Sequence, residues 1–247
     1  MIATLLFFIV PVILVEMTIL DDMIEFYRMI NRLTKKVGGE RILFSCHGRM
    51  AWPRRGVYFF MEEGEGRSDT GSGKRIVRVG THALTAYSKT TLWQRLSQHK
   101  GQAQSGGGNH RGSIFRLIVG TALVGRDDKG CATWGIGSTA TKATREQEID
   151  LERRVSHIIA SMPFVWLQIN DEPNGRSNRG YIERNSIALL SNYDKHPIDP
   201  ASLGWLGHRC NRERVRKSGL WNQNHVDEVY DPEFLGVLRD LVESHPV

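Results

Sequence analysis

From Asp21 to Val37, apolar residues recur three or four positions apart. This spacing places them on one face of an α-helix. Lys35-Lys36 followed by Gly38-Gly39 is typical of a helix C-terminus. We therefore predict an amphipathic helix and a lead-in within residues 17–52. The apolar stripe consists of Met23, Phe26, Tyr27, Ile30 and Leu33.

Residues 1–16 are almost wholly apolar, interrupted by Pro11 and closed by Glu16. No Lys or Arg precedes the run and no small-residue cleavage site follows it, so it is a poor signal peptide. It is either an extension outside the protein proper, with translation starting at Met17, or a membrane anchor. We favour the first, because an anchor would hold Glu16 in the bilayer at a cost of about 2.5–3.5 kcal/mol. In both cases the basic residues from Arg28 to Lys36 predict a cytoplasmic body.

Short runs of β-prone residues separated by turns begin at Arg41–Cys46. Gly56–Met61 and Arg75–Gly80 are predicted to pair as a hairpin, with the polar, glycine-rich segment Glu62–Lys74 as a long connection. Phe164–Ile169 is the third convincing strand. The fold class expected from this pattern is α+β, with a small three-stranded, mostly antiparallel sheet flanked by helices.

The other apolar stripes have helical spacing. The simplest organisation is one core domain over residues 53–193 with helical additions at both ends, of which residues 194–247 form the basic C-terminal one. Gly101–Gly112 has almost no apolar residue and is expected to be an exposed, flexible loop. Helices are expected at Thr91–His99, at Ser113–Val124, from the capping box Thr144-x-x-Gln147 to Pro163, at Asn178–Ser191 and from Asp231 onward.

Composition narrows the class of protein. With 247 residues, 40% of them hydrophobic and 24% charged, the chain is globular, and neither a disordered nor a collagen-like composition is present. Thirty-three Lys and Arg against 27 Asp and Glu give a net charge of +6, which favours an anionic partner. Cys46, Cys131 and Cys210 lie far apart, which excludes a disulfide framework and a paired-cysteine zinc site and fits a reducing cytosol.

Four short motifs follow one another along the predicted elements. One hairpin strand carries Gly56-Val57-Tyr58 and its partner carries Arg78-Val79-Gly80. The next helix carries Arg95 and His99, and a later helix carries Glu183. In this order the motifs resemble the GIY-YIG nuclease family over about residues 53–193, and the ordered series is far more specific than any one tripeptide. A His four residues after the Arg is similar to the branch that resembles restriction endonucleases.

The resemblance implies hydrolysis of DNA phosphodiester bonds, and the residue types suit that chemistry. The planar guanidinium of Arg95 matches a phosphate in two-point contact, and His99 reaches the same site from the same helix face. Glu183 falls on the apolar stripe of its helix, where a carboxylate needs a cationic partner. A single carboxylate with several waters is typical of Mg²⁺, so we expect Glu183 to be the metal ligand.

Further roles come from the resemblance alone. It implies that Tyr58 lies beside the attacking water as a general base or an orienting group, a role that needs a nearby cation because a free tyrosine titrates near pH 10. It also implies an Asn near the phosphate, for which Asn192 is the better match and Asn185 the alternative. The chain departs from the family at Arg78, which stands where the second tyrosine of the family name is expected. Arg78 either binds phosphate or marks a degenerate site.

Additional substrate contacts are expected outside the motifs. His110 and Arg111 lie in the glycine-rich loop and are candidates for DNA backbone contacts, although the loop is equally a mere connector. Arg212 and Arg216 belong to a basic run that either binds the backbone or is a solvated face.

Together these observations predict a Mg²⁺-dependent endonuclease that acts on DNA and is restriction- or defence-like in role. Its expected catalytic set is Tyr58, Arg95, His99, Glu183 and Asn192, with a possible homodimer on duplex DNA. The first rival is a catalytically degenerate nucleic-acid-binding protein of the same family. The second is a membrane-anchored protein whose main feature is residues 1–16.

Overall fold

The computed structural model describes residues 3–128 and 130–246, with side chains from Ile19 onward. Its centre is a four-stranded antiparallel sheet with the strand order β1-β4-β2-β3. The α+β class is confirmed, but the expectation of three strands is wrong, because the chain before the hairpin adds a short strand beside β4 through Arg41 and Ile42. The strands are β1 (Arg41–Ile42), β2 (Gly56–Gly66), β3 (Lys74–Gly80) and β4 (Pro163–Gln168).

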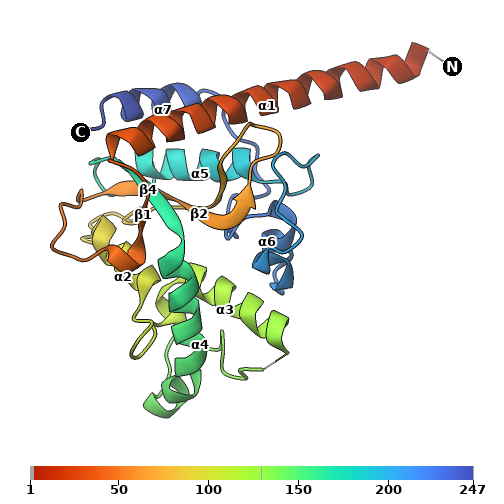
Figure 1. Cartoon of the computed structure of the whole chain (residues 1–247). Helices are drawn as coiled ribbons and strands as arrows, with labels where there is room; N and C mark the ends of the chain where they lie inside the picture. The colour runs from red at the N-terminus through yellow and green to blue at the C-terminus, as the bar shows by residue number, and fades with distance from the viewer. Residues whose placement is uncertain (1–2, 129, 247) are drawn as a thin grey trace.

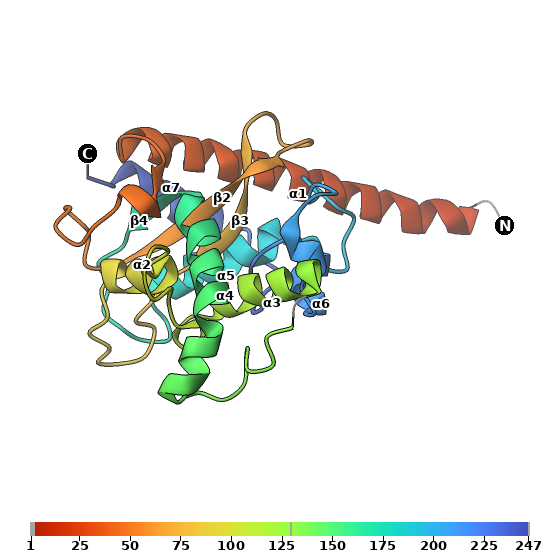
Figure 2. The same ribbon diagram turned by 60° about the horizontal axis from the view of Figure 1, so that its bottom comes forward.

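Helices cover both faces of the sheet (Figure 1). α1, α5 and α7 pack on one face, and α2, α3 and α4 lie on the other, where Figure 2 shows them together. The N-terminal part of α1 extends beyond the sheet in both views. The helices are α1 (Ala3–Lys36), α2 (Leu92–Lys100), α3 (Ile114–Asp127), α4 (Lys142–Ser161), α5 (Asn178–Leu190), α6 (Glu213–Ser218) and α7 (Phe234–Glu243), with single 3₁₀ turns at Leu43–Ser45, His110–Gly112 and Leu206–Arg209.

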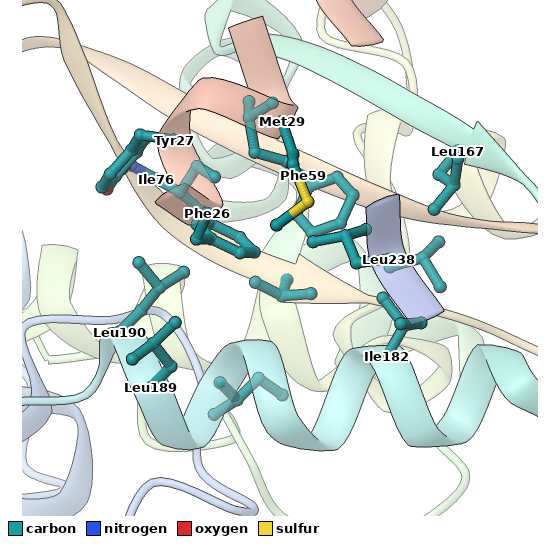
Figure 3. Packing of buried hydrophobic residues seen from close by; sticks show 14 of the residues in the cluster. Phe26, Tyr27, Met29, Phe59, Ile76, Leu167, Ile182, Leu189, Leu190 and Leu238 are labelled. Carbon is teal, nitrogen blue, oxygen red and sulfur yellow. Dashed lines mark hydrogen bonds between the residues drawn. The ribbon is translucent and has the colours of Figure 1, made fainter. Parts of the chain in front are cut away.

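Alternation along β2 divides the interior into two cores. Val57 and Phe59 face α1, α5 and α7, whereas Tyr58 and Phe60 face α2, α3 and α4. This is the period of two that a strand imposes on its side chains. Figure 3 shows the first core, in which Phe26 of α1 and Leu238 of α7 pack around Phe59. The sheet therefore separates an apolar core from a second layer that also contains the buried polar side chains of Tyr58, Arg78 and His99.

The hairpin is tighter than its sequence indicates. β2 continues to Gly66, so the connection shrinks to residues 67–73. The buried carboxylate of Asp199 accepts the backbone N–H groups of Ser68, Asp69 and Thr70 at 2.7–3.1 Å and fixes this turn. The prediction of a connection as long as Glu62–Lys74 was therefore wrong.

The C-terminal segment completes the sheet at the outer edge of β3. The N–H of Trp221 donates to the carbonyl of Val77 at 2.7 Å. The side-chain amide of Asn222 accepts from the N–H of Val79 at 3.1 Å and donates to its carbonyl at 2.9 Å. These contacts satisfy the edge groups that an unpaired strand would expose. No helix in residues 3–128 or 130–246 is both long and apolar enough to span a lipid bilayer.

Candidate active site

Tyr58 occupies a position that two glycines define. Its cross-strand partner is Gly80, and a Cβ atom at residue 80 would collide with the Tyr58 ring and hydroxyl. Gly56, two residues earlier on the same strand, passes the Leu167 carbonyl so closely that a Cβ would collide there too. Both glycines of the two tripeptides are therefore needed for close approach, which is a physical reason for the Gly-x-Tyr and x-x-Gly pattern.

His99 connects Tyr58 to the start of α3. Its Nε2 lies 2.8 Å from the Tyr58 hydroxyl and its Nδ1 lies 2.7 Å from the Oγ of Ser113. Ser113 is also the N-cap residue of α3 and accepts the N–H of Arg116 at 3.3 Å. Burial, and then the guanidinium groups of Arg95, Arg78 and Arg116, hold the pKa of His99 well below 6.5. At neutral pH this imidazole is uncharged, so one ring nitrogen donates and the other accepts.

Arg78 brings a buried positive charge to the same layer. Its side chain is 5% exposed, its guanidinium lies 5.3 Å from the centre of the Phe115 ring, and its Nη1 donates to the carbonyl of Trp221. Burial lowers the pKa of Arg78, and the neighbouring Tyr58 and Glu183 oppose that shift. An arginine keeps its charge under such conditions, so the site contains a permanent cation where the family pattern has a tyrosine.

Glu183 approaches from α5, on the other side of the end of β3. Its Oε1 accepts the backbone N–H of Thr81, the residue after Gly80, at 3.1 Å. Burial raises the pKa of Glu183 above 4.5, opposed by the charges of Arg78, His225 and Arg95 and by the Thr81 hydrogen bond. A carboxylate whose ionised form is disfavoured by burial is stabilised by any additional cation.

Arg95 lies on the solvent side of the group. It is half-buried on α2, and its Nη1 donates to Gln98 Oε1 at 3.2 Å and to the Gly112 carbonyl at 3.1 Å. The capping box of Thr91 and Gln94 fixes the first turn of this helix. Arg95 is thus held over His99, with its other nitrogens available for an anion.

The structure brings the motif residues together in two layers. Tyr58 and His99 are fully buried, whereas Arg95 and Glu183 are partly exposed. Arg78 acts electrostatically on both layers. The outer layer thus presents a guanidinium and a carboxylate, the groups that can bind a phosphate and a cation, above an inner phenol and imidazole.

The donor set around Glu183 fits a magnesium ion better than a zinc ion. Within the described residues, no cluster of three or more His, Cys, Asp or Glu side chains is placed to hold a metal. A zinc site normally needs three or four protein ligands, whereas Mg²⁺ is bound through one or two carboxylates, waters and substrate phosphate. Glu183, with one oxygen bound to Thr81 and a raised pKa, suits the second arrangement.

Neither asparagine candidate is directed into this group. Asn192 follows the C-terminus of α5, and its side chain bonds both backbone groups of Ile198, at 3.0 and 3.1 Å. It lies nine residues after Glu183, beyond the end of α5 at Leu190. Asn185 is buried and bonds the Tyr181 carbonyl and the N–H of Asp231, at 2.9 and 2.8 Å. In this structure both amides organise the backbone around α5.

His110 and Arg111 lie inside the protein instead of on a flexible loop. The His110 ring stacks on Trp134 at 3.9 Å between ring centres, and its Nδ1 is 3.0 Å from Glu152. Arg111 forms a two-point ion pair with Glu148, at 2.6 and 2.8 Å. The exposed loop predicted from the glycine-rich composition therefore ends in a buried polar network, in which both side chains are bonded to carboxylates of α4.

The two basic-run candidates also have internal contacts. Arg212 donates to Gln223, and the exposed Arg216 donates to the Cys210 carbonyl at 2.6 Å. These contacts hold α6 and the preceding 3₁₀ turn together. They leave part of the charge of Arg216 facing solvent.

Three nearby residues were not identified from the sequence. Ser113 bonds His99, Asn222 closes the strand beside Arg78, and His82 is buried near Arg95. Burial and the charge of Arg179 lower the pKa of His82 to about 4, so it is neutral at physiological pH. Only His82 had a usable signal, because it comes two residues after Gly80 at the end of the motif strand.

Comparison with known proteins identifies the family of the chain. The family model described as a GIY-YIG domain matches residues 17–247. The chain therefore belongs to the GIY-YIG family, whose members are generally endonucleases and commonly use divalent metals. Neither the curated proteins nor the solved structures contain a match. The resemblance inferred from the ordered motifs is confirmed, and DNA is the substrate that the family implies.

Proposed function

We propose that this protein is a Mg²⁺-dependent endonuclease that cleaves DNA phosphodiester bonds. The observation that carries the proposal is the convergence of Arg95, Glu183 and the Tyr58–His99–Ser113 chain at the end of β3. Phosphodiester hydrolysis needs a positioned water, neutralised phosphate charge and a stabilised leaving oxygen. The group supplies a candidate for each need.

In this mechanism Arg95 binds the scissile phosphate from the solvent side. Glu183 holds Mg²⁺, which when bound neutralises charge on the phosphate oxygens. Tyr58 orients the attacking water or accepts its proton. The neutral His99 supports Tyr58 by donating Nε2–H to the phenolic oxygen, since a positively charged imidazole beside three guanidinium groups is disfavoured.

In the proposed mechanism Arg78 acts electrostatically. It supplies a cation next to Tyr58 and Glu183 that stabilises negative charge on either. The rival reading, a degenerate member that binds nucleic acid without cutting it, also begins from Arg78. The intact Tyr58, Arg95, His99 and Glu183 favour an active enzyme.

The biological role proposed is restriction- or defence-like. It is supported only by His99 standing four residues after Arg95, the spacing that is similar to the restriction-endonuclease-like branch. The catalytic role of Asn192 stays a prediction, as do the substrate contacts of His110, Arg111, Arg212 and Arg216. The possible homodimer has no support from the structure, which describes one chain.

Cleavage of supercoiled plasmid tests the proposal. The full chain with Mg²⁺ is expected to nick or linearise the plasmid, and EDTA, Glu183→Ala and Arg95→Ala are each expected to abolish cleavage. Lys35→Ala, an exposed substitution on α1, is the control that keeps full activity. Binding without cleavage, unaffected by Glu183→Ala, would favour the degenerate reading instead.

A further inference from the structure

The loop of residues 81–91 joins two parts of the candidate site. It leaves β3 directly after Gly80, where Thr81 donates its N–H to Glu183. It ends at Thr91, the N-cap of the helix that carries Arg95. A DNA strand whose phosphate contacts Arg95 and Glu183 therefore passes beside this loop.

A shallow groove lies between the loop and the start of β2. The N–H of Leu92 donates to the Arg54 carbonyl at 3.0 Å, which places the groove one helical turn from Arg95. One wall is formed by the loop and the other by the chain that precedes β2 and the segment that follows β4. Its lining residues are Arg54, Arg55, residues 86–89, Glu172 and Pro173.

Tyr87 stands at the tip of the loop with its ring in solvent. The residue is 94% exposed, and its φ of 64° lies in the left-handed region that non-glycine residues rarely adopt. Tyr87 is the third residue of the turn that the N–H of Ser88 closes by donating to the Thr85 carbonyl at 3.1 Å. This turn accounts for the backbone conformation and leaves the flat face of the ring open to an external aromatic or apolar group.

Two cations flank this ring. Arg54 and Lys89 are both exposed, and neither has an ion-pair partner in the part of the chain that the structure describes. In the basic run Arg214 pairs with Asp227, and Lys217 pairs with both Asp194 and Glu213, whereas Arg212 and Arg216 have no ion-pair partner among the described residues.

The groove's one carboxylate does not cancel this charge. Glu172 lies 3.5 Å from the buried Arg55 and is compensated by it. The groove therefore keeps two positive charges, those of Arg54 and Lys89, for an external anion.

We propose that this groove binds the nucleotide next to the scissile phosphate, with its base stacked on Tyr87 and its backbone phosphates bound by Arg54 and Lys89. The inference rests on the proposed nuclease function, because the groove is defined by its place beside Arg95. Every base offers a flat face, so the stacking contributes affinity and fixes the strand without selecting a sequence.

Fluorescence anisotropy with a fluorescein-labelled DNA duplex, and with one of its strands alone, tests this assignment. All proteins carry Glu183→Gln so that the probe stays intact in Mg²⁺, and Kd is measured over a series of KCl concentrations. Tyr87→Ala is expected to weaken binding about 5- to 150-fold, the range measured for loss of one stacked base, whereas Tyr87→Phe binds like the parent. Arg54→Ala and Lys89→Ala each reduce the slope of log Kd against log salt by about 1.

Lys35→Ala, which removes an equally exposed lysine from α1, is the matched control and changes neither Kd nor slope. If Tyr87→Ala and Lys89→Ala bind both probes with the parent's Kd and slope, the groove is not a nucleotide site, although the nuclease proposal stands as long as the unmodified chain cuts plasmid. If the folded parent binds neither probe and the unmodified chain cuts nothing, the nuclease proposal and this inference fail together.

Discussion

At the residue scale, the candidate-site carboxylate of Glu183 opposes stability. The folded-state pKa of Glu183 lies above its ordinary value of 4.5, so the folded chain binds more protons than the unfolded chain between these two pKa values. Stability that is present below pH 4.5 is therefore lost as the pH rises through the folded-state pKa. Near neutral pH the ionised carboxylate disfavours folding, as is common for groups kept for function.

Glu183→Gln is accordingly expected to raise the Tm at pH 7 by a few degrees while abolishing Mg²⁺-dependent cleavage. A shift of about 1 kcal/mol corresponds to about 2–4 °C in a chain of this length. Thermal unfolding at pH 7 and again below pH 4.5 checks the sign of the change in Tm. The increase in Tm becomes smaller at the lower pH, because the native carboxyl is then protonated. Glu63→Gln, on a side chain that is 74% exposed, serves as the control. A Tm that falls equally at both pH values would contradict the argument.

A second residue-scale prediction concerns Gly80. The substitution Gly80→Ala places a methyl group against the Tyr58 ring and hydroxyl, which breaks the 2.8 Å contact with His99. Overpacking of this kind costs about 1–3 kcal/mol of folding free energy, and a displacement of about 1 Å in an active site costs about 10²-fold in rate. We expect Gly80→Ala to fold and to cleave plasmid at least about 10²-fold more slowly than the parent.

The same hairpin supplies the comparison for Gly80→Ala. A Cβ at Gly66 would meet its nearest neighbour, the Gly73 carbonyl, at 3.9 Å, an ordinary contact. Gly66→Ala should therefore keep both activity and Tm. Equal cleavage by the two alanine variants would show that the position of Tyr58 does not matter.

At the element scale, regular patterns were readable and pairings between distant polar residues were not. The apolar stripe of α1 and the Gly56 hairpin strand depend on local spacing, which the sequence displays directly. His110 and Arg111 were misplaced because their partners, Glu152 and Glu148, lie about forty residues away in α4. A polar, glycine-rich segment looks the same whether its charges face solvent or a buried carboxylate.

The residues of the candidate site also fall into two groups, those that the sequence predicts and those that only the fold brings to the site. Arg95 and His99 could be placed on one helix face from their spacing, and the ordered motifs added Tyr58 and Glu183. Ser113 and Asn222 could not be found, because a helix cap and an edge-covering amide have no signature that distinguishes them from other serines and asparagines. Their roles follow from contacts with His99 and Val79 that only the fold creates.

The edge of β3 provides the element-scale prediction. Asn222→Ala removes both hydrogen bonds to the backbone of Val79 and leaves a buried N–H and a buried carbonyl unpaired. Each such group costs about 1–3 kcal/mol, so urea unfolding should show a clearly reduced free energy of unfolding. Asn224→Ala, at an exposed position two residues later, should be neutral. If both variants unfold alike, the amide is not what closes this edge.

At the scale of the whole molecule, the C-terminal quarter belongs to the same folding unit as the motif segment. Trp221 is fully buried, bonds the backbone of Val77 and accepts a hydrogen bond from Arg78 through its carbonyl. Phe234 and Leu238 of α7 pack into the core beneath β2. The family model likewise extends over residues 17–247, beyond the segment that carries the motifs.

We therefore predict that a chain ending at Tyr193 does not fold cooperatively, although it retains every motif residue. Loss of residues 194–247 would expose the edge of β3, uncover the core that contains Phe59 and leave Arg78 without its carbonyl acceptor. An exposed strand edge of this kind favours aggregation. A chain starting at Met17 is the counterpart, because it keeps every side chain of α1 known to join the core, from Ile19 onward. Circular dichroism melting and hydrogen exchange compare the two truncations. Cooperative unfolding of the chain that ends at Tyr193, with plasmid cleavage retained, would show that residues 53–193 form an independent domain.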